Sequence, residues 1–98
     1  MERPRLSSQT RVAGLIEYTR AAMESVKAGR GDSHQGPSAQ QLVTAAFNAT
    51  TVFIRRRLGG VWAQDLVSAK TRVLAALDSG DVDAMEATLK GVAEPYGM

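Results

Sequence analysis

Apolar residues recur along the chain every three or four positions, which is the spacing of one face of an α-helix. The pattern fills four stretches, at about residues 8–28, 38–58, 61–77 and 81–92, and glycine-containing segments separate them. This order predicts an all-α fold, a small four-helix bundle. The second stretch has the clearest start, because Ser38 and Gln41 form an S-x-x-Q capping box directly after Pro37.

The first predicted helix has a glycine, Gly14, within its apolar pattern. Glycine inside a helix costs about 1 kcal/mol relative to alanine, so its presence needs a reason. We expect either that the helix starts later than Ser8 or that a neighbouring backbone comes close to Gly14.

The second predicted helix is apolar over a broad face made of two adjacent rows. One row is Leu42, Ala46, Ala49 and Phe53, and the other is Val43, Phe47, Thr50, Ile54 and Leu58. The run 50–54 is rich in β-branched residues and would suit a strand in isolation, but the helical spacing on both sides favours a helix. The face is wider than one small bundle covers, so we predict that this helix is the most buried and that the chain forms a homodimer.

The interface of that predicted homodimer is assigned to Phe47, Phe53, Ile54 and Trp62. Tryptophan is a favoured interface anchor. At helical spacing beside Leu66 and Val67, however, Trp62 is more often a core residue, so both interpretations stay open. The wider predicted core is drawn from all four helices: Leu15, Ile16, Met23, Val43, Phe47, Ile54, Trp62, Leu66, Leu74, Leu77, Met85 and Leu89.

Only about three residues, Asp78-Ser79-Gly80, connect the third and fourth predicted helices. A connection this short predicts an antiparallel helical hairpin at the C-terminal end of the domain. The segment 72–89 resembles the closing hairpin of the FCD ligand-binding domain of GntR-type regulators, and also tetratricopeptide hairpins. The resemblance implies the same hairpin geometry. It implies no metal site, because Lys70 and Lys90 stand near where the FCD histidines would be expected.

The chain of 98 residues is long enough for one domain. We predict a single helical domain over 1–98, with a basic N-terminal arm at 1–7, a Gly/Pro loop at 29–37 and a C-terminal tail at 93–98. Cysteine is absent and histidine occurs once, so cysteine-ligated metals and two-histidine sites within one chain are excluded. No catalytic or phosphate-binding motif is present. We therefore expect no cofactor, no metal and no enzymatic activity.

Charge is unevenly distributed along the chain, although the net charge is only +2. Residues 1–60 hold nine basic and four acidic side chains, whereas residues 61–98 hold three basic and six acidic ones. Such a layout is typical of solvent-exposed faces, or of copies that pair basic and acidic parts. The cluster Arg55, Arg56 and Arg57 ends the second helix, where it either compensates the helix dipole or binds nucleic acid.

These features favour a small, non-enzymatic protein-protein interaction module: an adaptor, a chaperone or a regulator of another protein, acting as a homodimer. No stretch is long and apolar enough for a membrane span, and we expect a cytoplasmic protein. Two alternatives stay open. One is a nucleic-acid-binding regulator that uses the arginine-rich part. The other is a small ligand-binding or enzymatic domain with a site at the dimer interface.

Overall fold

The computed structural model describes residues 6–29 and 38–98, and every regular element within them is helical. The elements are α1 (Leu6–Lys27), α2 (Ala39–Leu58), α3 (Gly60–Ser79), α4 (Val82–Ala93) and a short 3₁₀-helix, η1 (Glu94–Tyr96). The predicted all-α fold with four packed helices is confirmed. Residues 1–5 of the predicted arm and 30–37 of the predicted loop lie outside the described residues.

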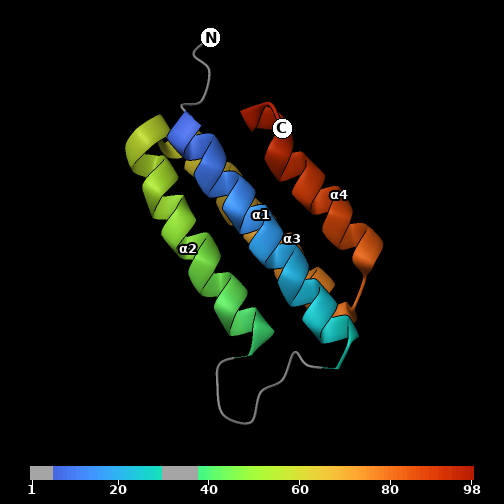
Figure 1. Ribbon diagram of the computed structural model, residues 1–98. Coiled ribbons are helices and arrows are strands. Elements are labelled where there is room, and N and C mark those ends of the chain that lie inside the picture. The colour runs from blue at the N-terminus through green and yellow to red at the C-terminus, as the bar shows by residue number, and fades with distance from the viewer. Residues whose placement is uncertain (1–5, 30–37) are drawn as a thin grey trace.

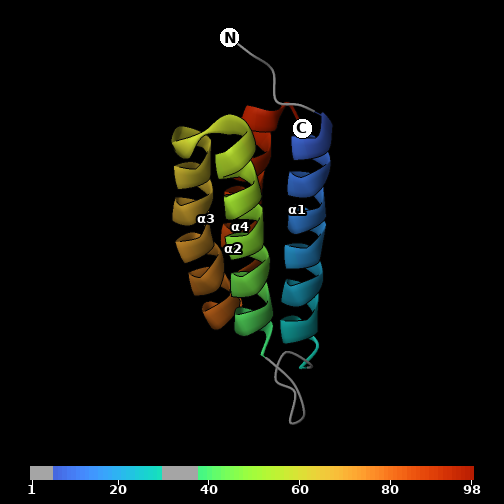
Figure 2. The ribbon, with the colours of Figure 1, turned by 90° about the vertical axis from the view of Figure 1, so that its left-hand side faces the viewer.

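The four helices pack side by side as a bundle (Figures 1 and 2). Each packs mainly against two neighbours: α1 against α2 and α4, and α3 likewise against α2 and α4. The start of α1, the α2/α3 junction and the end of α4 lie at one end of the bundle, and the α3/α4 junction lies at the other. At the first end, the side-chain amide of Gln9 donates a hydrogen bond to the carbonyl of Tyr96 at 2.7 Å.

Local sequence signals account for where α2, α3 and α4 begin and end. The predicted capping box is present, since the Gln41 amide donates to Ser38 Oγ and the Ser38 amide donates to Gln41 Oε1. Asp81 caps α4 by accepting from the Ala84 amide at 3.0 Å. The two junctions use glycine with positive φ, at Gly59 (φ 98°) and Gly80 (φ 69°), a region that favours glycine because it has no Cβ.

The β-branched run in α2 is helical, as the flanking spacing predicts. Thr50 and Thr51 are buried, and their hydroxyls donate to the carbonyls of Ala46 and Phe47 one turn earlier, at 2.8 and 2.7 Å. These bonds satisfy the hydroxyls inside the bundle, so that the two threonines are tolerated in a buried helix.

Most of the predicted core is buried. Ten of its residues are less than a tenth exposed, among them Phe47 and Ile54 with no exposed surface. Trp62 and Leu74 are only partly buried and pack against the core from its edge. The core also takes in residues that the sequence did not assign to it: Val12, Ala69, Val73, Ala76, Val92 and Tyr96.

The segment 93–98 differs from the predicted C-terminal tail. Pro95 lacks an amide hydrogen and ends the α-helical pattern, and the chain turns into η1. This turn carries Tyr96 into the bundle, where its side chain is 3% exposed and its ring lies 4.9 Å from that of Trp62. The end of the chain therefore completes the core.

Candidate functional site

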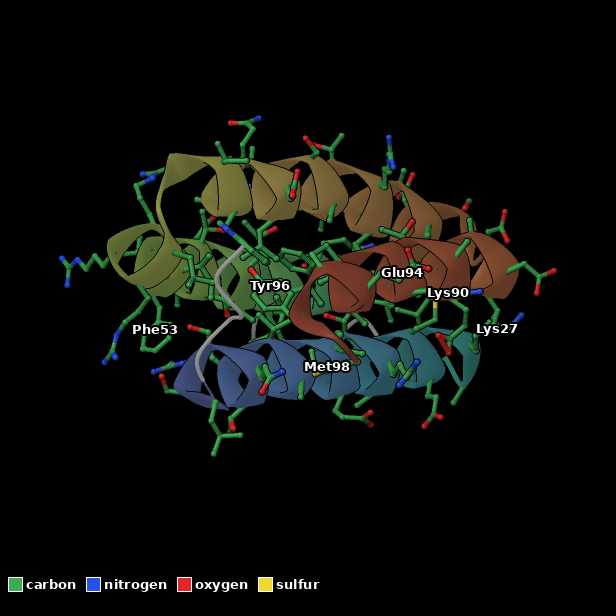
Figure 3. All side chains as sticks on the ribbon, turned by 90° about the horizontal axis from the view of Figure 1, so that it is seen from above. Lys27, Phe53, Lys90, Glu94, Tyr96 and Met98 are labelled. Carbon is green, nitrogen blue, oxygen red and sulfur yellow. The ribbon has the colours of Figure 1, made fainter. Side chains whose placement is uncertain are left out.

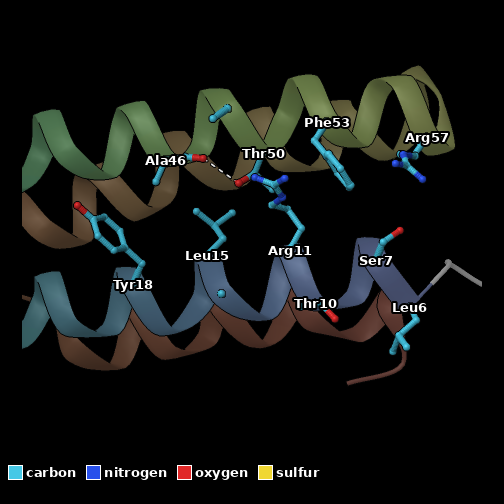
Figure 4. A pocket seen from close by; sticks show the side chains of 12 residues that line it. Leu6, Ser7, Thr10, Arg11, Leu15, Tyr18, Ala46, Thr50, Phe53 and Arg57 are labelled. Atoms are coloured by element: carbon cyan, nitrogen blue, oxygen red, sulfur yellow. Dashed lines mark hydrogen bonds between the residues drawn. The ribbon is translucent and has the colours of Figure 1, made fainter.

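An open groove of about 830 Å³ lies between α1 and α2 (Figure 4). Its walls are residues at helical spacing on the facing sides of the two helices. The groove-lining set from α1 is Ser7, Thr10, Arg11, Gly14, Leu15 and Tyr18, with Leu6 at its start, and the set from α2 is Ala46, Ala49, Thr50, Phe53 and Arg57. The groove therefore follows both helices for about three turns.

Small residues line the middle of the groove and leave open space there. Gly14 of α1 is exposed, and a Cβ atom built on it would meet nothing within 4 Å. Across from it, α2 contributes Ala46 and Ala49. Small residues at such positions let another backbone approach closely, which is how helices pack with short distances between their axes.

Phe53 lies in one half of the groove, beside two arginines. The guanidinium carbon of Arg11 is 4.4 Å from the centre of the Phe53 ring, and that of Arg57 is 5.1 Å from it. Arg11 and Phe53 point toward each other from α1 and α2 (Figure 4). Both distances suit a cation–π contact, worth about 0.5–1 kcal/mol at an exposed site.

The charges in the groove are of one sign. Arg11 and Arg57 are the charged residues among its lining, and the remaining polar ones are hydroxyl-bearing. In the part of the chain that the structure describes, the ion pairs join Arg20 to Glu17 and Glu86, and no carboxylate pairs with Arg11 or Arg57. The groove thus combines a largely apolar lining with positive charge that extends from its middle, at Arg11, to one end, at Arg57.

The four residues assigned to the dimer interface lie in different environments. Phe47 and Ile54 belong to the core and have no exposed surface for a partner. Trp62 is half-buried against Tyr96. Phe53 is half-buried beside the groove, between α2 and α1 (Figure 3). The interface itself stays a prediction, and Phe53 and Trp62 are the members with surface left for it.

The two apolar rows of α2 have separate roles. Val43, Phe47 and Ile54 point into the core with no exposed surface. Ala46, Ala49 and Phe53, from the other row, line the groove. The broad apolar face of this helix therefore serves two surfaces, of which the groove is left open within the described chain.

The arginine cluster does not form one surface. Arg55, Arg56 and Arg57 are all exposed in the last turn of α2, and Arg57 is the one that lines the groove. Consecutive residues on a helix point in directions about 100° apart, which explains the separation. Their role in nucleic-acid binding stays a prediction.

The sequence-based explanations of Gly14 are wrong. The helix begins before it, at Leu6, and no backbone of another described segment lies within 4 Å of a Cβ atom built on it. Arg11 and Tyr18 are not among the residues that the sequence predicts to form a site. One signal was available: residues 7, 11, 14 and 18 follow the spacing of one helix face.

A second groove, of about 420 Å³, lies between α3 and α4. It is lined by charges of both signs, including Asp65 and Arg72, and by Tyr96 and Gly91. The Tyr96 hydroxyl is buried without a hydrogen-bond partner among the described residues. Burial, and to a lesser extent the negative charge of Asp65, raises the pKa of Tyr96 from 10.0 to about 12.

Within residues 6–29 and 38–98, no three His, Cys, Asp or Glu side chains gather as they do around a metal ion. No helix in these ranges is both long and apolar enough to cross a bilayer. Comparison with known proteins finds no matching family model, no matching curated protein and no matching solved structure.

Proposed function

We propose that this protein is a non-enzymatic protein-protein interaction module and that its binding surface is the α1/α2 groove. One observation carries the proposal: an open groove with a largely apolar lining holds two arginines, Arg11 and Arg57, that pair with no carboxylate of the described residues. Exposed apolar surface rimmed by polar groups is typical of interaction sites. In this proposal α3 and α4, as an antiparallel hairpin, form the supporting side of the bundle.

The proposal is tested by filling the groove. Tryptophan at Gly14 projects into it from α1, and open space around the glycine lets the substitution fold. Gly91→Trp is the matched control, because Gly91 is also a helical glycine with open space around it, on the α3/α4 groove. Circular dichroism verifies that both variants are folded.

Partners are captured from a lysate on immobilised protein, purified, and then titrated against each variant by calorimetry. We expect a partner that binds the original protein and Gly91→Trp equally and binds Gly14→Trp at least tenfold more weakly. If every captured protein binds the two tryptophan variants alike, the groove is not the binding surface.

A second copy of the chain is one candidate occupant, as the predicted homodimer requires. The exposed apolar side chains beside the groove, Tyr18 (43% exposed) and Leu42 (41%), favour it. Sedimentation velocity decides: a dimer that Gly14→Trp dissociates and Gly91→Trp leaves intact would support self-association. A monomer at all concentrations would contradict the homodimer.

Nucleic-acid binding is the second candidate function. It is favoured by the exposure of Arg55, Arg56 and Arg57 at the end of α2. Fluorescence anisotropy of labelled duplex DNA at two salt concentrations tests it. Binding that falls steeply with salt and with Arg56→Glu would support it, and absence of binding at low salt would exclude it.

A further inference from the structure

We propose that the partner in the α1/α2 groove is a short amphipathic helix of another protein, with carboxylates along the half that lies beside Arg11 and Arg57. This inference rests on the proposed function and names the kind of partner that its surface accepts.

The shape of the groove fits a helix. Its α1 wall runs from Ser7 to Tyr18, which is about 17 Å along a helix axis. Two facing helices with small residues between them offer a seat for a third helix, as in a bundle. The open space beside Gly14 lies in the middle of this seat, where the approaching backbone comes closest.

The charge of the groove fits carboxylates. A guanidinium stacked on an aromatic ring keeps its N–H groups at the edge of its plane, where they can bind a carboxylate with two hydrogen bonds. The guanidinium carbons of Arg11 and Arg57 both lie over the Phe53 ring, and this contact reduces the side-chain freedom that is lost on binding. A helix that places basic residues beside Arg11 and Arg57 would be repelled by them.

The acidic surface of the chain itself does not supply this occupant. Three of the eight acidic residues of the described chain, Asp78, Asp81 and Asp83, lie around the α3/α4 junction. Val82 (42% exposed) is the large apolar side chain exposed beside them, and one such residue makes no stripe. Two copies paired groove to groove would bring arginines, and no carboxylates, into the interface between them.

The test is a selection from a phage-displayed library of helical peptides of about 14 residues, with apolar residues fixed at one face and all other positions random. The original protein is the bait, and Gly14→Trp removes peptides that bind elsewhere. We expect Asp and Glu to be enriched in one half of the selected peptides.

The enriched peptide is then titrated by fluorescence anisotropy against Arg11→Glu/Arg57→Glu. We expect its Kd to rise about tenfold or more, because two attractive contacts become repulsive. The matched control is Arg56→Glu/Arg72→Glu, which changes the net charge equally at exposed arginines outside the groove. It should change the Kd less than threefold at moderate salt, about 0.15 M.

Any other outcome contradicts the inference, and some of these outcomes leave the proposed function intact. Selected peptides without acidic enrichment, or with equal affinity for both double variants, contradict the acidic helix while the groove still binds. If no peptide remains after those that bind Gly14→Trp are removed, the groove and the inference are contradicted together. A stable dimer that Gly14→Trp dissociates shows that a second copy occupies the groove.

Discussion

The α1/α2 and α3/α4 grooves are built from similar parts and differ in what fills them. Each has a helical glycine (Gly14 or Gly91), an aromatic residue (Phe53 or Tyr96) and at least one arginine. In the α3/α4 groove the aromatic ring comes from η1 at the end of the chain and is 3% exposed. In the α1/α2 groove the ring of Phe53 is half-buried at the surface, and the groove is about twice as large.

The difference shows how the grooves between the helices of a small bundle are covered. Four helices leave a groove between each neighbouring pair, and a groove is closed only where further chain covers it. The 3₁₀-turn supplies that cover at one end of α3 and α4, where Tyr96 packs against Trp62. No described segment does the same for α1 and α2, so that groove stays open within the described chain.

The largest expected effect separates the two aromatic rings. Tyr96→Ala should lower the free energy of unfolding by about 3–5 kcal/mol, because it empties a buried site and removes the ring that Trp62 contacts. Phe53→Ala should cost only about 1–2 kcal/mol, the loss of partial burial and two cation–π contacts. Urea unfolding followed by circular dichroism measures both. Equal losses would mean that the α1/α2 groove is as closed as the other.

The pH dependence of stability reports on the same buried ring. The folded state raises the pKa of Tyr96 from 10.0 to about 12, so the folded protein holds this proton where the unfolded chain has lost it. Stability should therefore be unaffected by this group below about pH 10 and fall by up to about 1.4 kcal/mol per pH unit up to pH 12.

Tyr96→Phe is the control for that prediction. It removes a buried hydroxyl with no partner, so stability at neutral pH should be unchanged or slightly higher. The decrease in the free energy of unfolding that Tyr96 causes above pH 10 should disappear in the variant. Denaturant titrations at several pH values compare the two proteins, and identical pH profiles would contradict the burial of the hydroxyl.

The next largest loss of stability is expected at the junction between α2 and α3. Gly59 has φ 98° and ψ 178°, a conformation open essentially to glycine, and it is the single residue between the two helices. Gly59→Ala should cost about 1–3 kcal/mol. Gly60→Ala, at the adjacent helical position with open space around it, is the control and should not destabilise the protein. Thermal unfolding distinguishes them.

The local structure could be predicted from the sequence. The capping box at Ser38, the glycine junctions and the helical spacing act over a few residues, so the helices and most core residues follow from them. The burial of Tyr96 could not, because it follows Pro95, outside the helical pattern. It depends on a contact with Trp62, which lies far away in the sequence.

The groove was predictable only in part. Both rows of α2 are apolar, and the sequence pattern does not state which row faces the core. That choice depends on how α1 is rotated against α2, which places Val43 and Phe47 inside and Phe53 at the surface. Gly14 is an anomaly in the helical pattern of the sequence. Its position in a groove, however, depends on where α2 packs against α1.

The smallest expected effect tests whether Gly14 serves the fold of the chain itself. Gly14→Ala and Gly91→Ala should each raise the free energy of unfolding by about 0.5–1 kcal/mol, because both glycines are helical and an added Cβ atom meets nothing within 4 Å. Chemical unfolding of both variants measures the gains. Equal gains would mean that glycine at position 14 contributes nothing to folding, so that its value lies in what approaches α1 from outside. A loss at Gly14 alone would place an unrecognised contact of the chain in the groove, and the groove would not be open to a partner.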